Sequence, residues 1–175
     1  MATVTDPAET AIARLVRGAQ RGDRVAFAEL YQRFTRMVHG IVLARTARAA
    51  RSNVDDVVQD VFLTALERIG DLREPAAFGG WLAAIARHRA TDEHRRTPPT
   101  EALVDDVAVR APDPLDAMAI LDAIRSLPDA YSETLVLRLV EGMTGVEISD
   151  RTGLTPASVR VNLHRGMKLL REKLT

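Results

Sequence analysis

Apolar residues recur every three or four positions along most of the chain, which is the spacing of amphipathic α-helices. In the first half, one such stretch follows Asp23 and a second follows Asn53 and ends near Gly70, while a third runs over about 77–93. Asp23 and Asn53 are both suited to cap a helix N-terminus. No segment alternates with a period of two for long enough to form a strand. The pattern predicts a small helical bundle.

The second half has the same periodicity in shorter stretches, over about 115–126, 129–141, 144–151 and 156–173. Pro128 suits the start of the second stretch and Gly142 its end. The last two stretches are separated by Gly153, which can supply the positive φ of a tight turn, and Thr155 suits an N-cap. A short helix, a glycine turn and a second helix with a basic face are typical of a helix-turn-helix, although other helical hairpins share this pattern.

Residues 97–116 interrupt the helical pattern with four of the eight prolines and five acidic residues against a single arginine. Proline fixes φ and removes a hydrogen-bond donor, so this segment is expected to be extended. The sequence therefore predicts an all-α protein with two small helical domains, 10–96 and 117–175, joined by an acidic, proline-containing linker. Six of the seven aromatic residues precede the linker, and we expect the two halves to have separate cores.

The composition excludes several kinds of chemistry and of cellular location. The chain has 175 residues, of which 46% are apolar and 27% are charged, as in ordinary globular proteins. It contains no cysteine, which excludes disulfides, thiolate metal sites and cysteine nucleophiles. No apolar run approaches the length of a membrane span, and the N-terminus lacks the order of a secretion signal. These features predict a cytosolic protein.

Positive charge is concentrated although the formal net charge is zero. Five arginines and no acidic residue lie between Leu30 and Val54, and residues 156–175 carry five basic residues against Glu172. Basic stripes in a neutral protein favour contact with a polyanion, whereas solvated helix faces would account for them equally well.

The polar face of the stretch after Asn53 carries Asp55, Asp56, Gln59 and Asp60, with the apolar Leu63 on the same line. The helix dipole favours acids in the first turn, which accounts for Asp55 and Asp56. A Mg²⁺ site like that of helical prenyl-diphosphate enzymes would need a second metal motif and a larger bundle. A docking face for a basic protein partner is the remaining interpretation.

The 77–93 stretch combines basic residues with aromatic ones, a pattern that favours single-stranded nucleic acid. Trp81 is spaced with Phe78 and Ile85 as a core residue would be. The four histidines have no carboxylate at catalytic spacing. We therefore expect no metal site, no cofactor, no small-molecule substrate and no enzymatic activity.

Four segments together resemble bacterial RNA polymerase sigma factors of the extracytoplasmic-function type, the group 4 sigma-70 family, which keep only the second and fourth sigma regions. They are GDRVAFAELYQRF, VDDVVQDVFLTAL, AFGGWLAAIARHRATDEHRR and SLPDAYSETLVLRLVEGMTGVEISDRTGLTPASVRVNLHRGMKLLREKL. The resemblance covers about 10–96 and 117–174, in the family's order and with a linker between.

The resemblance implies a role for each face. The polymerase-binding residues would be Asp55, Asp56, Gln59, Asp60 and Leu63. The −10 element would be read and melted by Leu72, Phe78, Trp81, Arg87, His88, Thr91, Arg95 and Arg96. The −35 element would be contacted by Ser158, Arg160, Val161, His164, Arg165 and Lys168.

Three departures from the family pattern concern specificity. Leu72 stands where many members carry an aromatic residue and His88 where many carry asparagine, while Val161 and Asn162 replace a small polar residue and an arginine. Gly145 is also unusual and is expected to weaken its helix by about 1 kcal/mol.

The function implied is a transcription initiation factor that binds core RNA polymerase, directs it to −10 and −35 promoter elements and aids melting. An anti-sigma factor would be a further partner and could hold the protein at the membrane without insertion. The alternative is a helix-turn-helix regulator that binds duplex DNA without docking on polymerase.

Overall fold

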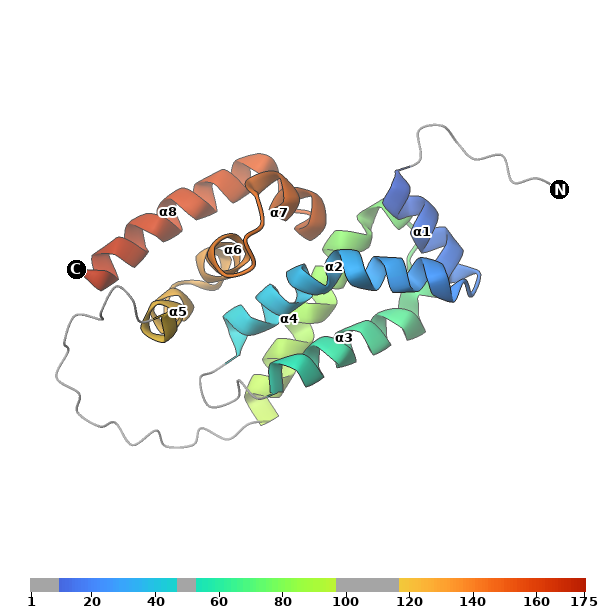
Figure 1. Ribbon diagram of the computed structural model, residues 1–175, viewed down its shortest axis with the longest axis horizontal. Helices are drawn as coiled ribbons and strands as arrows, with labels where there is room; N and C mark the ends of the chain where they lie inside the picture. Colours follow the sequence, from blue (N-terminus) through green and yellow to red (C-terminus); the bar gives the residue numbers. More distant parts are fainter. Residues whose placement is uncertain (1–9, 47–52, 97–116) are drawn as a thin grey trace.

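The described parts of the chain form helices and the turns that join them. The computed structural model describes residues 10–46, 53–96 and 117–175. Figure 1 shows the arrangement, whose elements are α1 (Ala11–Gln20), α2 (Arg24–Arg45), α3 (Val54–Arg68), the 3-10 helices η2 (Ile69–Asp71) and η3 (Pro75–Ala77), α4 (Phe78–Arg96), α5 (Ala117–Arg125), α6 (Asp129–Leu139), α7 (Gly145–Thr152) and α8 (Pro156–Leu174). The predicted linker, 97–116, lies outside the described residues.

Helix α1 is an element that the sequence analysis did not define. Thr10 caps it, and the Thr10 hydroxyl accepts a hydrogen bond from the backbone N–H of Ala13 at 3.2 Å. At its other end the side-chain amide of Gln20 donates to the carbonyl oxygens of Ile69 and Leu72, at 2.9 and 2.8 Å. Helix α1 therefore holds the turn between α3 and α4 in position.

The predicted helix starts in the N-terminal half are confirmed, but one for a different reason. Asp23 accepts from the backbone N–H groups of Val25 and Ala26, as an N-cap should. Asn53 occupies the N-cap of α3 without a side-chain capping bond. Its amide donates instead to Glu93 Oε1 at 3.2 Å, which ties the start of α3 to α4.

The helix-turn-helix is present in α7 and α8. Gly153 ends α7 with φ of 76°, and the Thr155 hydroxyl accepts from the backbone N–H of Ser158, as predicted. Thr144 and Glu147 form a capping box at the start of α7. Gly145 is the first residue of that helix. The expected penalty applies to helix interiors, so Gly145 weakens α7 less than the sequence suggested.

The expectation of separate cores is wrong, because the two halves share one buried cluster. Leu137, Met143, Ile148 and Val159 of the C-terminal half belong to the same cluster as Phe78 and the other core residues of the N-terminal half. A smaller cluster around Leu135 and Leu170 also reaches Ala44 of α2. Helices α6 and α7 pack against α2 and α4 to make this contact (Figure 1).

Two glycines allow the halves to approach so closely. A Cβ atom on Gly79 would lie 2.3 Å from the carbonyl oxygen of Arg151 in α7. A Cβ atom on Gly40 would lie 2.7 Å from Leu137 Cδ2 in α6. Gly40 lies inside α2 and Gly79 at the start of α4. A larger side chain at either position would prevent the close packing of the two halves.

Candidate functional site

The outer face of α3 is acidic with apolar side chains among the acids. Asp55, Asp56, Gln59 and Asp60 are all exposed, and Leu63 is 58% exposed. Leu66, which the sequence analysis did not select, adds a second apolar side chain at 50% exposure one turn further on. The helix dipole favours the two acids of the first turn but does not reach Asp60 or explain the exposed leucines. We call Asp55, Asp56, Gln59, Asp60 and Leu63 the α3 face.

Among the described residues, no three His, Asp or Glu side chains are placed to hold a metal ion. None of the described helices is both long and apolar enough to cross a membrane.

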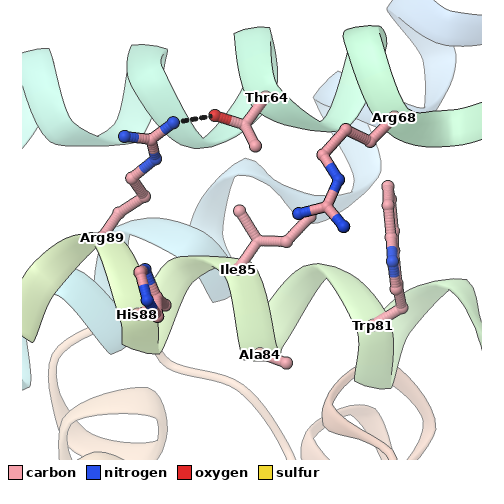
Figure 2. A pocket seen from close by; sticks show the side chains of 7 residues that line it. All are labelled: Thr64, Arg68, Trp81, Ala84, Ile85, His88 and Arg89. Atoms are coloured by element: carbon pink, nitrogen blue, oxygen red, sulfur yellow. Dashed lines mark hydrogen bonds between the residues drawn. The ribbon is translucent and has the colours of Figure 1, made fainter.

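A groove lies between α3 and α4, with a volume of about 420 Å³. Figure 2 shows that Arg68 reaches from α3 toward α4, so that its guanidinium lies between Ile85 and Trp81 in this view. Farther along, Arg89 Nη2 donates to the Thr64 hydroxyl at 2.7 Å and bridges the two helices. The groove therefore combines an aromatic ring with two guanidinium groups.

Sequence reasoning missed Arg68, Arg89 and Thr64 as groove residues. Thr64 and Arg68 are four residues apart on α3, as Trp81, Ile85 and Arg89 are on α4, so each set shares one helix face. That spacing was visible in the sequence. The facing of the two sets across a groove was not, because it depends on how α3 and α4 pack.

The residues expected to read the −10 element lie in different environments. Trp81 is half-buried, packs on Phe78 with ring centroids 5.8 Å apart, and lines the groove. His88 lines it too, with its side chain 77% exposed and paired with Asp92 at 3.1 Å. Phe78 is fully buried, so in this conformation it can act on DNA only by supporting Trp81.

Two further −10 candidates, Leu72 and Thr91, are not among the residues that line the groove. Leu72 is half-buried and follows η2. Thr91 is half-buried and its hydroxyl donates to the carbonyl oxygen of Arg87 at 2.9 Å. Arg95 and Arg96 end α4, and their side chains are outside the described part of the structure.

Arg87 does not face the groove. Its guanidinium binds the carboxylate of Glu133 from α6, with Nη2 2.7 Å from Oε1 and Nε 3.0 Å from Oε2. This hydrogen bond is the main reason that the pKa of Arg87 is raised above its usual value, with burial opposing it. A residue expected to contact DNA is thus held by the other half of the same chain.

The outer face of α8 agrees with the predicted pattern. Every residue expected to contact the −35 element is exposed, namely Ser158, Arg160, Val161, His164, Arg165 and Lys168. Val159 and Leu170 are buried against the rest of the domain, and Leu163 and Met167 are half-buried. Asn162 turns away from this face, and its amide donates to the Thr134 hydroxyl of α6 at 3.3 Å.

A second polar contact joins the halves beside the α3 face. His39 Nδ1 of α2 lies 2.6 Å from Glu141 Oε1 of the C-terminal half, and Arg36 donates to the Glu141 carbonyl oxygen. The hydrogen bond with Glu141 is the largest cause of the raised pKa of His39. Burial opposes it, and the charges of Glu141 and Asp55 add to it.

The His39 contact predicts pH-dependent stability. Because the pKa of His39 is raised on folding, its contribution is complete below the unfolded value of about 6.5 and is lost as pH rises through the folded value. The free energy of unfolding in urea should therefore decrease as the pH rises above about 6.5. His39→Gln should flatten this decrease, whereas His164→Gln, on the exposed face of α8, should retain it. An unchanged slope in His39→Gln would contradict the prediction.

Comparison with known proteins identifies the family. The Sigma-70 region 2 family matches residues 30–98, and the Sigma-70, region 4 family matches residues 117–170. The RNA polymerase sigma factor CarQ of Myxococcus xanthus is 34% identical over 161 residues, covering 87% of this chain and 91% of CarQ. The ECF RNA polymerase sigma factor SigD of Mycobacterium tuberculosis is 32% identical over 176 residues, covering 91% of this chain and 82% of SigD.

Solved structures include one with the same fold. CnrH, solved in complex with the cytosolic domain of CnrY, superposes with a TM-score of 0.65 at 24% identity, over 94% of this chain and 97% of CnrH.

The two matched regions define a class of protein, the sigma-70 transcription initiation factors. Within that class, the chain belongs to the extracytoplasmic-function (ECF) sigma factors. It is accordingly a promoter-specific transcription initiation factor, with core RNA polymerase and promoter DNA as its partners. The resemblance found in the sequence is confirmed, and a regulator that acts on duplex DNA without polymerase is not favoured.

Proposed function

We propose that the α3 face is the surface that docks on core RNA polymerase. The observation that carries the proposal is the exposure of Leu63 among acids that all point outward. An apolar side chain within a charged rim is the usual arrangement at a protein interface. The partner surface would be basic with an apolar recess.

The groove between α3 and α4 and the outer face of α8 are then the two promoter-reading surfaces. At the −10 element, Trp81 would stack on an unpaired base while Arg68, Arg89 and His88 contact phosphates. Unstacking a base costs a few kcal/mol, which such contacts offset. Leu72, Arg87, Thr91, Arg95 and Arg96 complete the −10 set, with Phe78 acting through packing.

At the −35 element, α8 would enter the major groove as the recognition helix. Arg160, Val161, His164 and Arg165 would face base edges, and Ser158 and Lys168 would contact the DNA backbone. The protein acts without catalysis of its own, in the cytoplasm, where polymerase and promoters are. An anti-sigma factor is the expected regulator and could hold the protein at the membrane.

The docking proposal is tested by charge reversal on the α3 face. Asp60→Arg should abolish co-elution of the purified chain with core RNA polymerase in size exclusion, because it places a cation against a basic partner. Asp60 is exposed, so the variant should unfold at the same urea concentration as the wild type.

The matched control is Glu172→Arg, the same change of charge on an exposed residue near the end of α8. It should leave co-elution intact. If both variants lose co-elution, net charge rather than the α3 face controls binding. If neither loses it, polymerase docks elsewhere on the chain.

A further inference from the structure

A buried carboxylate sits at the centre of the contact between the two halves. The side chain of Glu133 is only 6% exposed, and it lies between Arg87 of α4 and Arg45 of α2. Arg87 holds both carboxylate oxygens, and Arg45 Nη2 lies 3.5 Å from Oε2. Arg45 also pairs with Asp129 at 2.8 Å. The N-terminal half thus supplies the cations and the C-terminal half the anions.

The two-oxygen contact of Arg87 with Glu133 is the geometry by which arginine also binds phosphate. Arg87 lies on α4, one residue from His88 of the groove and four residues before Thr91. A carboxylate supplied by the chain itself therefore occupies a cationic site beside the surface proposed to hold the melted −10 strand.

The contact contains polar groups that disfavour it. Arg45 Nε and Ser132 Oγ are buried at or next to it without a hydrogen-bond partner, and each such group lowers the stability of the closed form. Gly79 meets the backbone of Arg151, so the two halves touch without interlocking side chains there. Opening would also expose the apolar residues that the two halves bury in one shared cluster, so the closed form is held by that burial as well as by the contacts of Glu133.

Promoter spacing requires that opening. Elements named −10 and −35 are about 25 base pairs apart, or about 85 Å along the DNA axis at 3.4 Å per base pair. A compact chain of this length has a radius of gyration of about 16 Å, so the closed form cannot reach both. Twenty residues, 97–116, join the halves, and that length of chain extends to about 70 Å, enough to let them separate.

The geometry points to an internal phosphate mimic: Glu133 closes the molecule by occupying the Arg87–Arg45 site, and this site exchanges the carboxylate for DNA backbone phosphates when the halves separate. The inference rests on the proposed function for the meaning of the DNA contact. It assigns to one residue of the −35 domain the control of DNA access to the −10 domain.

Two variants open the contact by different means. Glu133→Gln removes the charge but keeps the shape, and Gly79→Ala adds a Cβ that would lie 2.3 Å from the Arg151 carbonyl oxygen while leaving every charge in place. Both should increase the radius of gyration measured by small-angle X-ray scattering. Glu67→Gln, which removes one exposed carboxylate from α3, is the matched control and should not increase it.

The DNA readout is binding of fluorescein-labelled oligo(dT), because phosphate contacts do not depend on sequence. Both opened variants should bind it at least about 5-fold more tightly than the wild type, since the competent form is no longer a minor fraction. The slope of log K against log salt should steepen by about 0.7 for each phosphate gained.

If both variants have a larger radius of gyration and bind oligo(dT) more tightly and with a steeper salt dependence, the inference is supported. Expansion without tighter binding overturns the exchange, and no expansion in either variant overturns the closure by Glu133. The docking proposal is tested separately, by co-elution of the wild-type chain with core polymerase.

Discussion

Phe78→Ala is expected to lower the free energy of unfolding by about 3–5 kcal/mol, a large part of the stability of a protein of this size. Phe78 is fully buried at the start of α4, with its ring edge-on to Phe34 at 5.1 Å and tilted against Trp81 at 5.8 Å. Alanine would leave a cavity beneath Trp81 and next to the contact between α4 and α7. Urea unfolding followed by circular dichroism measures the loss.

Phe78→Leu separates packing from a direct DNA contact. Leucine fills most of the space, so the loss of stability should be only about 1–2 kcal/mol, and promoter-dependent transcription should persist. If Phe78 instead stacked on a base of the −10 strand, Phe78→Leu would lose transcription while remaining folded at assay temperature. That result would contradict the supporting role given to Phe78 here.

The helix boundaries could be predicted from the sequence because their causes are local. Asp23, Gly153 and Thr155 act within three residues of the helix ends that they define. The exposed α8 face could be predicted for the same reason, since it depends only on the period of one helix. Asn53 shows the limit of this reasoning, because its partner Glu93 is 40 residues away.

The shared core and the position of Arg87 could not be predicted in this way. The resemblance to sigma factors implied that Arg87 contacts the −10 element, which requires an outward position on its helix, and Arg87 does point outward from α4 taken alone. What covers that side is Glu133, 46 residues further along and beyond the linker. The uneven distribution of aromatic residues suggested separate cores, whereas aliphatic side chains such as Leu137 and Ile148 join them. Gly40 and Gly79 were the available signal, as glycines within helical patterns.

The closed arrangement gives the two proposed DNA surfaces different exposure. The residues of the proposed −35 surface on α8 are exposed, whereas Arg87 of the proposed −10 surface is held by Glu133. On this proposal, the free protein would meet duplex −35 DNA more readily than a melted −10 strand. Binding in this order, with the −35 duplex before the −10 strand, would keep the factor from binding single strands before polymerase brings it to a promoter.

Arg165→Ala is expected to reduce binding to the preferred −35 sequence by about 1–3 kcal/mol and to relax the preference at one position. Arg165 is exposed one helical turn after Val161, whose own side chain is 43% exposed on the same face of α8. An arginine there can hold a guanine by two hydrogen bonds, and the adjacent valine can contact a thymine methyl group. The preferred sequence is obtained by sequencing the fraction of a randomised duplex library that the full-length protein retains.

Lys168→Ala is the matched comparison, because Lys168 is also a cation on the exposed side of α8 but one turn nearer its end. As a phosphate contact it should weaken all sequences alike and reduce the salt slope by about 1. If Arg165→Ala instead behaved as Lys168→Ala is expected to, Arg165 would be a phosphate contact. Base readout would then fall to Arg160, Val161 and His164.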